Sequence, residues 1–145
     1  MTGDEFLTLA DAMLHESQGR SEAICRTAIS RAYYGAFHLS LAFLQQLGVA
    51  VGKDHGDIWR CLASSQVVVA KQAATRLAML HEDRTLADYK LDSPKPKSFA
   101  YARDCVDRGL YIQRLMDTCH QEPARSQIKV GIEAHRKSLG PRGSI

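Results

Sequence analysis

Two side chains with anion-binding and acid–base chemistry, Arg31 and His38, lie seven residues apart. If their segment is helical, both fall on one face, about 10.5 Å apart along the axis. A guanidinium forks onto phosphate or carboxylate oxygens, and an imidazole exchanges a proton near neutral pH. Tyr34 lies between them and is directed toward the same face. The spacing predicts that the three side chains converge on one groove, where Arg31 can face a bound anion.

A long apolar helix is expected to position these side chains. Ser21 can cap a helix start and Gly48 suits a helix end, so we predict a helix over about 22–47. Only two formally charged side chains occur between residues 23 and 52, which indicates burial on nearly all sides. Small residues that recur every seven positions let another backbone approach closely, and this seam predicts a homodimer through the helix. The seam consists of Ala28, Gly35 and Ala42.

The two arginines of this helix have different expected partners. Glu22 lies one turn before Arg26 and can form an ion pair with it. Arg31 has no acidic side chain within reach on its own helix, so it needs a partner on another helix or a bound anion. A structural pairing of Arg31 with Asp88 is therefore the alternative to a functional groove.

Apolar residues recur with helical periodicity along the rest of the chain. No segment alternates apolar and polar residues with the β-branched enrichment of a strand. Short connections between long helices favour antiparallel neighbours. The predicted fold is therefore all-α, an up-and-down antiparallel helical bundle of about five helices. Besides the long helix, these are expected over about 3–18, 54–64, 66–90 and 98–120.

The formal net charge of +3 is concentrated near the C-terminus. Residues 121–145 hold five basic and two acidic side chains, whereas residues 1–120 hold fourteen of each sign. We expect a helical bundle over 1–120 and a basic C-terminal tail over 121–145, in which 124–138 is either a weak helix or disordered. Because the tail holds few large apolar residues, we expect it to be dispensable for folding. The neutral body is not a general polyanion-binding surface, so contact with nucleic acid requires a local patch or the tail.

Composition argues against several other classes of protein. The four cysteines lie far apart and the histidines lack zinc-ligand spacing, so we predict no metal and no cofactor. No run approaches the ~18–20 apolar residues of a membrane span. The first residues are acidic where a signal peptide is basic. We therefore expect a cytoplasmic protein without a membrane partner.

The segment around Arg31 and His38 carries a resemblance to a known family. The run SRAYYGAFH at 30–38 resembles the signature of HEPN domains, in which an arginine is followed, after four to six residues, by a histidine. A second run, RTLADY at 84–89, is similar to the end of a later helix in small stand-alone members of that family. The resemblance covers roughly residues 5–120 and implies a small helical bundle.

The resemblance also implies chemistry on RNA. In active family members two protomers pack so that both Arg/His pairs line one cleft, where an RNA 2′-hydroxyl attacks its own phosphodiester. Transferred to this chain, His38 is the acid or base and Arg31 holds the phosphate. The implied protein is a homodimeric, metal-independent endoribonuclease, the toxin of a toxin–antitoxin or phage-defence pair. The residues expected to contact RNA are Arg31, Tyr34 and Arg84.

One position departs from the family pattern. Catalytic members usually have Asn, Asp or His directly after the arginine, and this chain has Ala32. That residue favours the alternative function, a non-catalytic module that binds RNA, a nucleotide or a partner protein such as a nucleotidyltransferase antitoxin. Asp88 and Tyr89, in the second run, are expected to make structural pairings.

Overall fold

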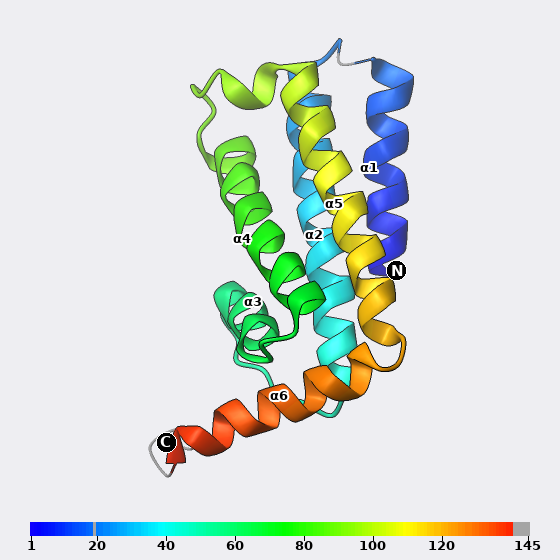
Figure 1. Cartoon of the computed structure of the whole chain (residues 1–145). Coiled ribbons are helices and arrows are strands. Elements are labelled where there is room, and N and C mark those ends of the chain that lie inside the picture. The colour runs from blue at the N-terminus through cyan, green and yellow to red at the C-terminus, as the bar shows by residue number, and fades with distance from the viewer. Residues whose placement is uncertain (19, 141–145) are drawn as a thin grey trace. The chain divides into compact units, whose positions relative to one another are not determined.

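The computed structural model describes residues 1–18 and 20–140, and all regular structure in that part of the chain is helical (Figure 1). The predicted all-α fold is confirmed, with six α-helices in the described residues where about five were expected. Residues 141–145 of the predicted tail, including Arg142, lie outside the described residues. The elements are α1 Gly3–Ser17, α2 Glu22–Gln46, α3 His55–Ser64, α4 Val68–Tyr89, the 3₁₀-helix η1 Lys95–Lys97, α5 Phe99–His120 and α6 Ala124–Ser138.

Local hydrogen bonds explain where the first two helices begin and end. At α1, Thr2 and Glu5 form a capping box, each side chain accepting a hydrogen bond from the other residue's backbone N–H. At α2, Ser21 Oγ accepts from the Ile24 N–H at 3.3 Å, which confirms the predicted N-cap. Gly48 follows α2 with φ +78°, a left-handed conformation that glycine adopts without strain, as predicted for the helix end.

The chain divides into two compact units. Unit 1 comprises Met1–Leu39 and Arg76–Gln113, and unit 2 comprises Ser40–Thr75 and Arg114–Ile145. Helices α2, α4 and α5 each contribute residues to both units. The predicted division into a bundle over 1–120 and a tail over 121–145 is not tested by these units and stays a prediction.

In unit 1, α1 and α2 approach closely through two glycines. A Cβ atom on Gly35 would lie 2.9 Å from the Gly3 carbonyl oxygen and 3.2 Å from the Leu7 backbone nitrogen. Ala28, another member of the small-residue seam, is fully buried. The seam therefore has a packing role within the chain at Gly35, and this position is not free to meet a second copy. The homodimer therefore remains a prediction, and Gly35 no longer supports it.

In unit 2, the segment expected to be a weak helix or disordered is helix α6, which packs on α3. Ile128 and Ile132 are both fully buried. A Cβ atom on Gly131 would lie 2.1 Å from the Ser65 carbonyl oxygen, so the backbone of α6 lies directly on the end of α3. The expectation that residues 121–145 are dispensable for folding disagrees with this burial. Two isoleucines spaced i, i+4 give α6 an apolar stripe that the surrounding charges obscure in the sequence.

Truncation after Gln121 is expected to lower the melting temperature clearly. Loss of Ile128 and Ile132 removes about 3–6 kcal/mol of apolar burial, at about 1.5–3 kcal/mol for each side chain. Differential scanning calorimetry of the full chain and of the truncated chain measures the effect. Truncation after Ser138 keeps all of α6 and is the control. A melting temperature unchanged by the longer truncation would restore the original expectation of a dispensable tail.

Candidate functional site

The first predicted pair, Arg31 and His38, lies on an exposed face of α2 in unit 1. The ring of Phe6, from α1, contacts both side chains. Arg31 Cζ is 5.7 Å from the centroid of the Phe6 ring, within the range of a cation–π interaction. The His38 ring stacks on the Phe6 ring, with centroids 5.7 Å apart and an interplanar angle of 18°. Phe6 therefore brings the arginine and the histidine into one aromatic cluster.

Tyr34, the third predicted residue, joins the same cluster. Its ring is stacked with that of His38, with centroids 6.3 Å apart and an interplanar angle of 30°. The Tyr34 hydroxyl accepts a hydrogen bond from Arg84 Nη2 at 2.7 Å. The tyrosine is therefore held at both ends, with its ring beside the histidine and its hydroxyl on α4.

Arg84 is committed to contacts inside the protein. Its guanidinium lies 5.1 Å from the ring centroid of Tyr34 and 5.0 Å from that of Tyr89. Arg84 Nη2 donates to the Tyr89 hydroxyl at 3.2 Å, and Arg84 Nε lies 2.9 Å from Asp88 Oδ2. Burial lowers the pKa of Arg84, but the neighbouring Tyr34, Tyr89 and Asp88 outweigh it and raise the pKa above its usual value. Only 13% of this side chain is exposed, so Arg84 positions Tyr34, and the geometry gives no support to its predicted direct RNA contact.

The alternative pairing of Arg31 with Asp88 is wrong. Asp88 instead pairs with Arg84 on its own helix and accepts a hydrogen bond from Ser30 Oγ at 3.0 Å. Asp88 and Tyr89 share Arg84 as a partner, through an ion pair and a hydrogen bond respectively. Arg31 is left without an ion pair or a hydrogen bond from its side chain in the described part of the chain.

The arrangement can bind an anion beside a stacked base. Aromatic rings next to an exposed guanidinium are the combination with which proteins hold single-stranded RNA, because rings stack on bases while arginine contacts phosphate. His38 adds a group that can give or take a proton at the same place. Among the described residues, no three His, Cys, Asp or Glu side chains are grouped so that they could hold a metal ion.

Sequence reasoning identified Arg31, Tyr34 and His38 but missed the role of Phe6. Phe6 is one of several apolar residues in α1, and nothing local in the sequence distinguishes it from the others. Its role follows from the glycine contact that sets α1 against α2. The pairing of Arg84 with Asp88 did have a sequence signal, since the two residues are spaced i, i+4.

Family models, curated proteins and solved structures were compared with the chain, and none of them matches it. The HEPN resemblance therefore stays a prediction that depends on segments 30–38 and 84–89. In the described part of the chain, every helix is too short or too polar to cross a lipid bilayer.

Proposed function

We propose that the chain binds RNA on the face formed by Phe6, Arg31, Tyr34 and His38, which is called the Arg31 face below. The observation that carries this proposal is the contrast between two arginines of unit 1. The guanidinium of Arg84 interacts with Tyr34, Tyr89 and Asp88, whereas the exposed Arg31 lies over the Phe6 ring and has no ion pair or side-chain hydrogen bond in the described part of the chain. A charge on an aromatic platform with open hydrogen-bonding positions suits a phosphate beside a stacked base.

We further propose that this face cleaves the RNA it binds. The RNA 2′-hydroxyl attacks the adjacent phosphorus while neutral His38 takes its proton. The bond from phosphorus to the 5′-oxygen breaks, and an imidazolium gives that oxygen a proton. The products are a 2′,3′-cyclic phosphate and a 5′-hydroxyl. Arg31 stabilises the charge that develops on the phosphoryl oxygens.

This reaction needs an acid as well as a base, and the Arg31 face supplies one imidazole. A second copy of the chain, placing its own His38 at the same phosphate, supplies the other. The proposal therefore includes a homodimer with the two Arg31 faces in one cleft. In this form the protein is an endoribonuclease toxin, and its partner is an antitoxin that resembles a nucleotidyltransferase, as the HEPN resemblance implies.

The second candidate function is a binding module without catalysis. The observation in its favour is Ala32, which follows Arg31 and is fully buried. A Cβ atom on Gly109 would lie only 3.3 Å from Ala32 Cβ, so the position is packed against α5. No polar side chain can assist the reaction from there. In this case the Arg31 face holds RNA, a nucleotide or a partner protein without cleaving it.

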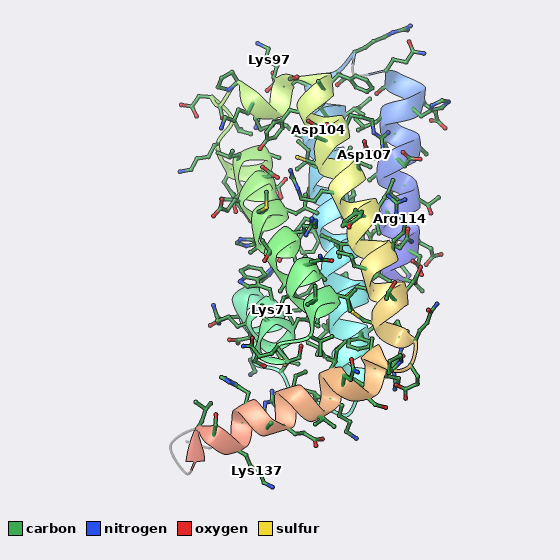
Figure 2. The ribbon with its side chains drawn as sticks, viewed as in Figure 1. Lys71, Lys97, Asp104, Asp107, Arg114 and Lys137 are labelled. Carbon is green, nitrogen blue, oxygen red and sulfur yellow. The ribbon has the colours of Figure 1, made fainter. Side chains whose placement is uncertain are left out.

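Arg31→Ala is expected to weaken the binding of single-stranded RNA about 10–100-fold, because a hydrogen bond to a charged group contributes about 1.5–3 kcal/mol. Fluorescence anisotropy with a labelled oligonucleotide, at fixed salt concentration, measures the change. Arg114→Ala, on α5 (Figure 2), removes the same charge from another exposed site and is the control. Equal losses in both variants would indicate only general charge attraction and would contradict the proposed site. So would unchanged binding in Arg31→Ala.

A further inference from the structure

Unit 2 contains an open cavity that plays no part in the proposed RNA chemistry. Its volume is about 520 Å³, within the range of about 300–1,000 Å³ that is usual for small-molecule sites. Its walls come from α3, from α6 and from the segment before α3. The polar lining residues are Asp57, Arg60, Cys61, Ser64, His135 and Arg136.

Asp57 is the single carboxylate among the described lining residues, and the charge of Arg60 balances its charge. Asp57 Oδ2 accepts the Asp54 N–H at 3.1 Å, and Asp57 Oδ1 accepts from Arg60 Nη2 at 2.9 Å. The hydrogen bond from Arg60, followed by that from the Asp54 backbone, lowers the pKa of Asp57. Asp57 is therefore ionised at neutral pH and balances Arg60. Arg136 therefore gives the cavity a net positive charge.

Arg136 is held in place without losing its capacity to bind. Its Nη2 donates to the Ala50 carbonyl oxygen and lies 3.8 Å from Cys61 Sγ. In the described part of the chain, Nε and Nη1 of Arg136 take part in no hydrogen bond or ion pair. The neighbouring residue His135 adds an imidazole to the same wall. A guanidinium anchored at one nitrogen presents its remaining N–H groups in a fixed direction, as bidentate recognition of an oxyanion requires.

We propose that this cavity binds a small phosphate monoester. Arg136 and His135 contact the phosphate, and the body of the ligand lies along Val51 and Leu139, which give the cavity an apolar wall. The site lies within unit 2 and does not depend on the Arg31 face. The site also differs from a general basic surface, because a single anchored arginine, Arg136, recognises the phosphate.

Isothermal titration calorimetry of the full chain tests the proposal with three probes: glycerol 3-phosphate, ribose 5-phosphate and adenosine 5′-monophosphate. At least one probe is expected to bind, and its parent alcohol or nucleoside is expected to bind at least about 10-fold more weakly, as loss of a charge-assisted contact requires. Arg136→Gln should weaken binding about 10-fold or more. Lys137→Gln is the matched control, because Lys137 extends from the same helix away from α3 (Figure 2) and does not line the cavity.

Arg136→Lys separates recognition from folding. It keeps the charge but removes the fork, so it should weaken probe binding while the melting temperature stays that of the parent chain. The proposal is overturned if no probe binds, if the parent compounds bind as tightly, or if Lys137→Gln and Arg136→Gln weaken binding equally. Arg31→Ala should leave the binding of glycerol 3-phosphate and ribose 5-phosphate, which carry no base, unchanged, so the phosphate site and the proposed RNA site fail or stand separately.

Discussion

Arg26→Ala is expected to lower the free energy of unfolding by about 3–5 kcal/mol, the cost of breaking a buried charge network. The Arg26 side chain is only 8% exposed and pairs through Nε with Glu22 Oε2 at 2.8 Å. Its two terminal nitrogens donate to five backbone carbonyls at the end of α4 and just after it, those of Leu86, Ala87, Lys90, Leu91 and Ser93. The last carbonyls of a helix have no intrahelical partner, so the guanidinium replaces the missing donors. Alanine removes this donor from the carbonyls of Ala87, Leu91 and Ser93, whereas those of Leu86 and Lys90 still accept backbone N–H groups, from Lys90 and Ser93.

Urea denaturation followed by circular dichroism measures this effect, and two variants isolate its cause. Glu22→Gln removes the ion pair but keeps the contacts of Arg26 with the carbonyls, so it should cost about 1 kcal/mol or less. Arg60→Ala removes an arginine from an exposed i, i+3 pair with Asp57 and should cost equally little. If Arg26→Ala falls in the same range as these two, the carbonyl contacts contribute little and the interpretation is wrong.

The helices could be predicted because local chemistry determines where they begin and end. Ser21 and Gly48 bound α2 within one residue of the predicted range, since a hydroxyl at the start and a left-handed glycine at the end act on the nearest backbone groups. The same face of α2 carries Arg31 and His38 for an equally local reason, the helical repeat. These features do not depend on which helices pack together.

The partners of these side chains could not be predicted, because they depend on tertiary packing. The Glu22–Arg26 pair was visible from its spacing, but the five carbonyls around Arg26 come from a segment sixty or more positions later in the chain. Phe6 lies beside Arg31 only because Gly3 and Gly35 let α1 and α2 approach closely. For the tail, net charge suggested an unpacked end, whereas two buried isoleucines determine the fold of that segment.

His38→Ala is expected to reduce RNA cleavage about 10²–10⁴-fold, the usual contribution of a general acid or base, while RNA affinity changes little. Arg31→Ala, in contrast, is expected to lower RNA affinity, because the arginine holds the phosphate whereas the imidazole transfers protons. Single-turnover cleavage of a labelled oligonucleotide measures the rate, and anisotropy measures the affinity. The proposed reaction predicts 2′,3′-cyclic phosphate ends and activity that persists in a chelator.

The control for His38→Ala is His15→Ala, since His15 is an exposed histidine of α1 in the same unit. His15→Ala should cleave RNA at the rate of the parent chain. Equal cleavage by His38→Ala would indicate a copurified nuclease. If the parent chain binds RNA through Arg31 but does not cleave it, the protein is a binding module, as the buried Ala32 favours. The Arg31 face then binds RNA without catalysis. If an excess of His38→Ala mixed with the parent chain lowers activity by more than dilution accounts for, two chains share one cleft, because a mixed dimer holds only one of the two imidazoles that the reaction needs.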